Sequence, residues 1–134
     1  MKDYIVYHNP DVMGYPASQV NTLEIVTNHV AKKATDGRVW LLTGEGRPRK
    51  YYLRLYFTIE SVGSGEDVGF RTRVSGTNGK IFDPMPNLDG EDWLPGLKRD
   101  TGNFSFGFRA IRSPRITDGL EKVAGISAKA AGSN

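Results

Sequence analysis

The residues of this chain best suited to chemistry are the cations of one short turn. Arg47-Pro48-Arg49-Lys50 follows Gly44-Glu45-Gly46 and places three positive charges within four residues. Such cations bind phosphate oxygens, and planar rings such as those of the nearby Trp40, Tyr51 and Tyr52 stack on nucleobases. The pattern fits contact with nucleic acid. It also fits a solvated hairpin tip whose charges keep the protein soluble.

Two strand-like runs flank this turn and direct it toward solvent. Residues 39–43 form the first run, and in 51–60 apolar and polar residues alternate with a period of two, as in a half-buried strand. Further strands are expected at 4–7, 70–75 and 103–111. Alternation predicts that one set of apolar residues faces a common core: Leu53, Leu55, Phe57, Phe104, Phe106 and Phe108.

Turn and helix signals complete the expected order of elements. Asn78-Gly79 predicts a hairpin turn that leads to a returning strand at 80–82. The interval 18–34 has a roughly helical pattern, with Asn21 and Glu24 as a capping box, although the β-branched residues at 25–27 fit a strand equally well. A helical turn at 91–94, stopped by Pro95-Gly96, and a helix at 117–124 follow.

Composition limits the class of protein. The chain has 134 residues, no cysteine, two histidines and a formal net charge of +3. We expect a single domain over 1–124 with a frayed tail at 125–134, no disulfide, no metal and no cofactor. The N-terminus lacks the apolar segment of a signal peptide, and no run approaches a membrane span. A cytoplasmic protein without membrane contact is the expectation.

These signals predict a mixed α+β, mainly β fold of five to six strands and one to three short helices in a strongly curved sheet. The order of elements resembles the PUA-like superfamily, and within it the EVE, ASCH and YTH group. The resemblance rests on the opening strand with Tyr4 and Tyr7, the strand at 37–42, the long strand at 51–60, and Trp93-Leu94 before the strand at 102–108. It implies a small pseudobarrel that binds nucleic acid, DNA or RNA, and holds a modified base in an aromatic-lined pocket.

A pocket for a base requires a ring for stacking, polar groups for the base edge and cations for the flanking phosphates. Trp93, in a Pro- and Gly-rich loop, is expected at the pocket rim, whereas Trp40, inside a strand, fits the core better than the pocket. The candidate pocket residues are Asn9, Tyr15, Trp40, Thr43, Trp93, Asn103 and Ser105. The candidate phosphate contacts are Arg47, Arg49, Lys50, Arg71, Arg73 and Arg109, which we expect to form a continuous basic face from Arg47 to Arg73.

Other polar clusters carry weaker signals. His8 beside Asn9 fits a hydrogen-bonded turn better than a general base, and Asp89, Glu91 and Asp92 fit a solvated loop better than a metal site. Because no catalytic constellation is present in the sequence, we expect a binding module and not an enzyme. The alternative is a small-ligand-binding or protein-interaction barrel whose cations only solubilise its surface.

Overall fold

The computed structural model describes residues 2–27, 36–64, 72–105 and 108–126. In chain order the elements are β1 (Asp3–His8), α1 (Pro10–Met13), the 3₁₀ turn η1 (Ala17–Gln19), β2 (Glu24–Thr27), β3 (Arg38–Glu45), β4 (Lys50–Ser64), β5 (Thr72–Ile81), α2 (Leu94–Asp100), β6 (Phe108–Ile111) and α3 (Pro114–Val123).

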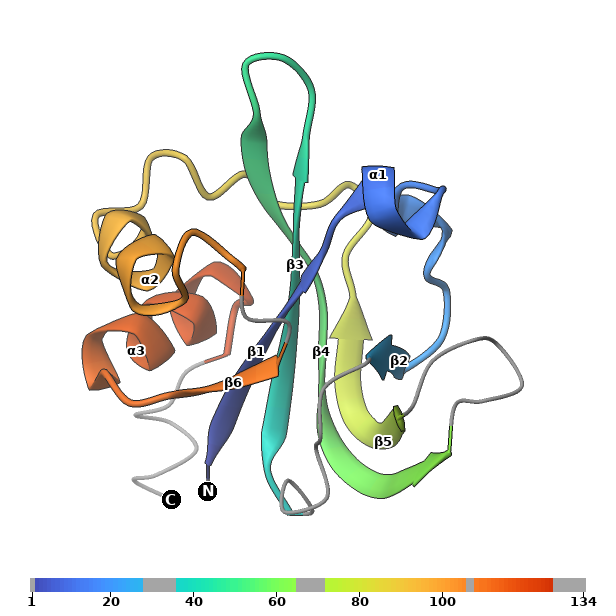
Figure 1. Cartoon of the computed structure of the whole chain (residues 1–134). Coiled ribbons are helices and arrows are strands. Elements are labelled where there is room, and N and C mark those ends of the chain that lie inside the picture. The colour runs from blue at the N-terminus through green and yellow to red at the C-terminus, as the bar shows by residue number, and fades with distance from the viewer. Residues whose placement is uncertain (1, 28–35, 65–71, 106–107, 127–134) are drawn as a thin grey trace.

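One mixed sheet joins the strands in the order β2-β5-β4-β3-β1-β6. β1 runs parallel to β3, and the other neighbouring strands pair antiparallel. α2 and α3 lie together beside the sheet, and the β3–β4 hairpin projects beyond it (Figure 1). The mixed α+β, mainly β fold is confirmed. The sheet does not close into a barrel, because β2 and β6 form its two edges among the described strands.

Each face of the sheet carries its own apolar core, because side chains alternate between the faces along every strand. The helix-side core includes Ile5, Trp40, Leu42 and Leu53 from the strands and Leu94, Leu97, Ile116 and Leu120 from α2 and α3. The opposite core includes Tyr4, Val6, Ile25, Val39, Leu41, Leu55, Phe57, Ile59 and Val74. Burial of each large apolar side chain contributes about 1.5–3 kcal/mol, so both faces stabilise the sheet.

The prediction that Leu53, Leu55 and Phe57 share one core is wrong. The register between β3 and β4 shifts at Leu41/Leu42, so that Leu41 pairs with Leu55 and Leu42 with Leu53. Arg54 is the extra residue of this bulge. Leu53 therefore packs toward the helices, whereas Leu55 and Phe57 pack on the opposite face.

The strand expected at 103–111 is shorter than predicted, since β6 begins at Phe108. Phe104 lies in a turn with a φ of +64° and packs in the helix-side core, whereas Phe108 packs against the opposite core. Phe106 lies outside the described residues. The alternation of phenylalanines therefore does not place Phe104 and Phe108 on one face of a strand.

The hairpin expected at Asn78-Gly79 is also wrong, because β5 continues through this dipeptide. Asn78 has a φ of +53°, and the β4–β5 register shifts twice along this stretch. A Cβ at Gly76 would overlap the carbonyl of Thr58, and one at Gly79 would overlap that of Tyr56. Both glycines therefore let the two strands approach closely at bulges, where a turn was expected.

The helix expected over 18–34 is replaced, in its described part, by η1 and β2. Glu24 pairs with Arg73 across β2 and β5, and the Asn21 side chain accepts a hydrogen bond from Arg54, so the expected capping box does not form. The β-branched residues of β2 thus favour a strand, which is the alternative that the sequence offered for 25–27. Residues 28–34 of this prediction lie outside the described residues.

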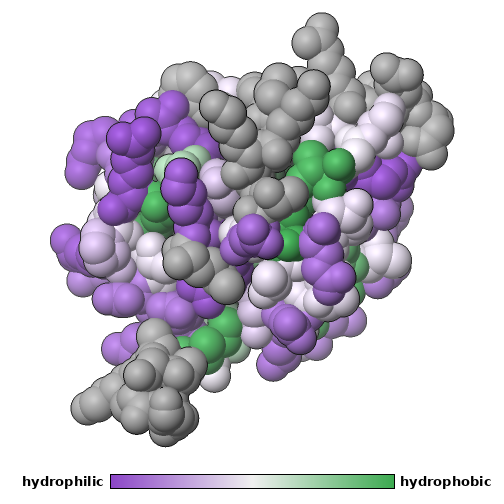
Figure 2. Space-filling model, turned by 90° about the horizontal axis from the view of Figure 1, so that it is seen from below, coloured by the Kyte–Doolittle hydropathy of each residue, from purple (hydrophilic) through white to green (hydrophobic). Residues whose placement is uncertain are grey.

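Pro95 and Gly96 lie in the first turn of α2 instead of stopping a helical turn, because proline is well tolerated there, where no intrahelical N–H bond is lost. α3 confirms the predicted helix near 117–124 and starts three residues earlier, at Pro114. No helix among the described residues is long and apolar enough to span a bilayer. Seen from below, hydrophobic residues show in separate patches between hydrophilic ones (Figure 2).

Candidate functional site

The β3–β4 hairpin exposes the predicted cations at its tip. Glu45 pairs with Lys50 at the last rung of the hairpin, and Gly46 has a φ of +85°, which side-chain-bearing residues rarely adopt. Arg47, Arg49 and Lys50 are all exposed. Arg47 and Lys50 form no hydrogen bond or ion pair with other described residues through their side chains, so both charges are available to a partner.

Three aromatic rings gather at the base of this hairpin. Tyr7 and Phe104 stack with ring centroids 4.7 Å apart and an interplanar angle of 11°. The Tyr51 ring lies 5.3 Å from Phe104 and 6.3 Å from Tyr7, centroid to centroid. Lys98 Nζ lies 4.7 Å from the centre of the Tyr51 ring, a cation–π arrangement. We call Tyr7, Tyr51, Phe104, Arg49 and Lys98 the tip platform.

Arg49 connects the cationic turn to these rings. Its Nη1 donates to the Tyr7 hydroxyl at 2.9 Å, and its Nη2 lies 3.4 Å from a carboxylate oxygen of Asp11. A Cβ at Gly44 would overlap both the Tyr7 hydroxyl and the Arg49 side chain, so only glycine leaves this contact undisturbed. Burial raises the pKa of Tyr7 above its usual value, and the Arg49 guanidinium partly opposes this. The hydrogen bond with Tyr7 raises the pKa of Arg49.

Four of the predicted polar pocket residues fall into two groups. Asn103 and Ser105 are exposed on either side of Phe104, next to the tip platform. Asn9 instead caps α1 by accepting a hydrogen bond from the Asp11 N–H at 3.0 Å, and the buried Thr43 donates to the His8 carbonyl at 2.8 Å. Asn103 and Ser105 are thus the ones placed to contact a ligand of the platform.

Neither tryptophan offers an open ring. Trp93, expected at a pocket rim, has 4% of its surface exposed and packs in the helix-side core, where a Cβ at Gly119 would overlap its indole. The side chain that was expected to line a loop pocket therefore fills the space between loop and α3. Trp40 is fully buried, and its Nε1 donates to Asp3 at 2.9 Å. Of the two positions considered for Trp40, core and pocket, the structure shows the core.

The predicted basic face from Arg47 to Arg73 is not continuous. Arg73 pairs in register with Gly63, at the end of β4 remote from the hairpin turn, and forms an ion pair with Glu24. Arg109 lies on the edge strand β6 opposite Ile5 of β1. Arg71 lies outside the described residues. The cations of the hairpin turn therefore act as a local cluster.

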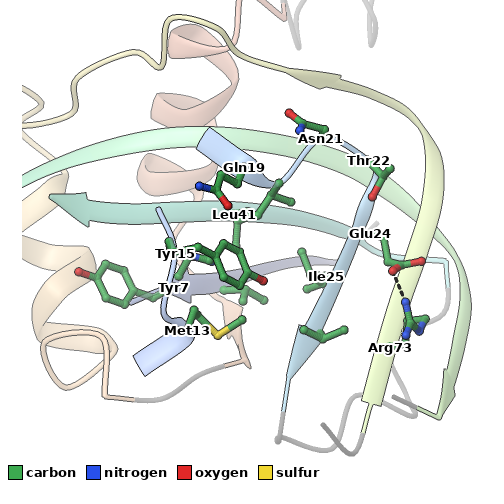
Figure 3. Close-up of a pocket in the computed structure, with 14 residues that line it drawn as sticks. Tyr7, Met13, Tyr15, Gln19, Asn21, Thr22, Glu24, Ile25, Leu41 and Arg73 are labelled. Atoms are coloured by element: carbon green, nitrogen blue, oxygen red, sulfur yellow. Dashed lines mark hydrogen bonds and ion pairs between the residues drawn. The ribbon is translucent and has the colours of Figure 1, made fainter. Parts of the chain in front are cut away.

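A cleft of about 640 Å³ opens on the face of the sheet opposite α2 and α3 (Figure 3). Ile25 points from β2 toward Tyr15, whereas the Tyr7 ring points away from the other labelled side chains (Figure 3). The cleft, as we use the name below, is lined by Val6, Tyr7, His8, Met13, Tyr15, Gln19, Val20, Asn21, Thr22, Glu24, Ile25, Val26, Leu41 and Arg73. Of the predicted pocket residues, Tyr15 alone is in this lining.

Two buried side chains hold the cleft wall in place. His8 Nε2 lies 2.8 Å from the Tyr15 carbonyl, and burial lowers the pKa of His8, which favours the neutral ring as donor. Arg54, 3% exposed, donates to the carbonyls of Ser18 and Val20 at 2.9 and 3.1 Å and to Asn21 Oδ1 at 3.1 Å. Hydrogen bonds from these two buried side chains therefore hold the backbone of the cleft wall in position.

The acidic loop does not assemble a reactive site. Asp89 accepts a hydrogen bond from the Tyr51 N–H at 3.0 Å, Glu91 accepts from the Trp93 indole, and Asp92 pairs with Arg115. Among the described residues, no three side chains of the metal-binding types cluster. Each carboxylate of this loop has a structural partner.

Several residues of these sites carried no usable signal in the sequence. From the sequence, Tyr7 is only an aromatic residue of the first strand, Phe104 fits the core side of a strand, and the helix that carries Lys98 is not predicted. Arg54 occupied a polar position in an alternating strand, which indicated exposure. Alternation cannot reveal a bulge, and only the tertiary fold brings Tyr7, Tyr51 and Phe104 together.

Comparisons of the chain with known protein families, curated proteins and solved structures find no match.

Proposed function

We propose that the chain is a non-catalytic nucleic-acid binding module that contacts its partner through the tip platform and the adjacent Arg47 and Lys50. The observation that carries this proposal is the clustering of stacked rings with cations at one exposed hairpin. Arg47 and Lys50 supply positive charges that no described residue pairs with, and Tyr7 and Tyr51 are half-buried beside them. Proteins bind single-stranded nucleic acid by combining cation–phosphate contacts with stacking of bases on aromatic rings.

Single strands fit this surface better than duplexes, because the rings require unpaired bases for stacking. Asn103 and Ser105, which flank Phe104, supply amide and hydroxyl groups for a base edge. The resemblance of the element order to PUA-like domains supports the same class of partner. In this proposal the open curved sheet is a variant of the PUA-like pseudobarrel, and Trp40 and Trp93 belong to its core instead of a base pocket.

Binding of short single-stranded DNA and RNA, followed by fluorescence anisotropy at roughly 50 and 200 mM salt, tests the proposal. Changing Arg47, Arg49 and Lys50 together to Ala should weaken binding at every sequence. It should also flatten the slope of log K against log salt by about 2, since each single-strand phosphate contact contributes about 0.7.

A matched control removes three exposed cations at the other end of the sheet. Lys2, Arg112 and Lys122 lie near the ends of β1, β6 and α3 that are remote from the hairpin turn. Changing these three to Ala lowers the net charge by the same amount as the hairpin variant does. It should leave most of the affinity for single-stranded nucleic acid. If the hairpin variant binds as tightly as the wild type at low salt, or if the wild type does not bind, the small-ligand or protein-interaction alternative replaces this proposal.

A further inference from the structure

The cleft has the size and floor of a small-molecule site. Its volume of about 640 Å³ lies within the range of roughly 300–1,000 Å³ that is usual for ligand pockets. Aliphatic side chains from three strands, Val6, Ile25 and Leu41, belong to both its lining and the opposite core. A ligand in the cleft would therefore rest on apolar surface.

The charges of the lining cancel. Glu24 and Arg73 form an ion pair with each other across β2 and β5 (Figure 3), and His8 favours its neutral form because burial lowers its pKa. The described lining thus has no unpaired charged side chain. A charged ligand would lose hydration on entry without gaining an ionic partner, so this cleft favours an uncharged one.

One wall of the cleft offers hydrogen-bond donors. Gln19 is the last residue of η1, Asn21 and Thr22 follow it before β2, and all three are exposed. Because Asn21 Oδ1 accepts from Arg54, the orientation of the amide is set and its NH₂ group remains to donate. A carbonyl or hydroxyl oxygen on the ligand would complement this wall.

The wall exists before any ligand binds. The buried Arg54 guanidinium ties three positions of the wall to β4, and it also donates to the Phe82 carbonyl at 2.7 Å. No described carboxylate pairs with Arg54, so this buried charge is satisfied by neutral oxygens alone. Such preorganisation lowers the entropic cost of binding.

We propose that the cleft is a second binding site, which shares only Tyr7 with the tip platform, for an uncharged and mainly apolar small molecule that carries a carbonyl or hydroxyl oxygen at one end. This inference does not depend on the proposed nucleic-acid function. It rests on the neutral lining, the aliphatic floor and the donor wall together.

The neutral fluorophore prodan, a naphthalene with a ketone, is a suitable probe, and the anionic naphthalene dye ANS is its charged counterpart. The wild-type protein should bind prodan saturably at one site and bind ANS at least roughly tenfold more weakly, since the sulfonate finds no free cation in the lining. Non-saturable prodan binding, or equal affinity for ANS, overturns the proposal.

Two variants locate the probe. Gln19→Trp fills the cleft from an exposed position, and Asn21→Asp keeps an oxygen for Arg54 while it removes the NH₂ donor; each should weaken prodan binding roughly tenfold. Asp118→Trp, on an exposed position of α3, is the matched control and should bind as the wild type does. Circular dichroism confirms that each variant is folded. If both cleft variants retain wild-type affinity, the cleft is not the site.

Competition distinguishes this proposal from the nucleic-acid one. A single-stranded oligonucleotide that binds the tip platform should leave prodan affinity unchanged, and displacement of prodan would show that the two sites are one. If the wild type binds prodan but no oligonucleotide, the cleft proposal stands and the nucleic-acid proposal fails.

Discussion

The tip platform and the cleft use opposite faces of the same sheet, and they differ in the kind of side chain that each face presents. The platform combines stacked rings with exposed cations, whereas the cleft has an aliphatic floor and charges that cancel. β1 contributes to both, because Tyr7 packs toward the helix side and Val6 and His8 face the cleft. A single strand thus supports a cationic surface and a neutral one within three consecutive residues.

The two regions also differ in how they are held. Arg49, an exposed side chain with one hydrogen bond to Tyr7 and a weak ion pair, orders the platform, whereas the buried Arg54 orders the cleft wall through three hydrogen bonds. An exposed guanidinium can exchange its partners for phosphate oxygens at little cost. A buried one cannot, so the cleft should be rigid and the platform adaptable.

The largest effect should follow from removal of the cleft anchor. Arg54→Met leaves the carbonyls of Ser18, Val20 and Phe82 without their donor, so the free energy of unfolding should fall by about 3 kcal/mol or more in urea denaturation. Arg47→Met, in the exposed turn, is the control and should change stability by less than about 0.5 kcal/mol. A loss below about 1 kcal/mol for Arg54→Met would contradict the contrast in rigidity.

A smaller effect is expected at the platform without any change in charge. Gly44→Ala places a Cβ against the Tyr7 hydroxyl and Arg49, so it should reduce oligonucleotide affinity about three- to tenfold, the scale of one hydrogen bond. Prodan binding should not change. Gly63→Ala on β4, where a Cβ meets no atom within 4 Å, serves as the control. Equal oligonucleotide affinities for the two glycine variants would argue against a role for the Arg49–Tyr7 contact.

The smallest effect is the contribution of His8, in the cleft lining, to the pH dependence of stability. Burial lowers the pKa of His8 from its ordinary value of 6.5, while the Tyr15 carbonyl and Glu45 oppose this. The unfolded chain then binds more protons than the folded one below pH 6.5, so stability should fall as the pH drops through this window. His8→Gln should make the melting temperature less dependent on pH below 6.5. An unchanged pH profile would show that His8 does not titrate differently in the two states.

The sequence predicted the two strands of the hairpin, their exposed cationic turn and the mainly β class, because alternation and charge are local properties. It did not predict the bulge at Arg54 or the turn at Phe104, since both depend on how a neighbouring strand or helix packs. The tryptophans show the same limit: Trp93 sits in a loop whose composition indicated exposure, yet α3 covers it at Gly119. Asn78-Gly79 by itself predicts a turn, because the dipeptide does not encode the close approach of β4 to β5.

The position of β1 in the sheet has a consequence for synthesis of the protein. β1 holds residues 3–8, yet it pairs with β3 on one side and with β6, residues 108–111, on the other. During translation the first strand therefore leaves the ribosome long before its second neighbour is made. Until then one edge of β1 has no strand partner, and such an edge can pair with another chain. Completion of the sheet must wait for the last quarter of the chain.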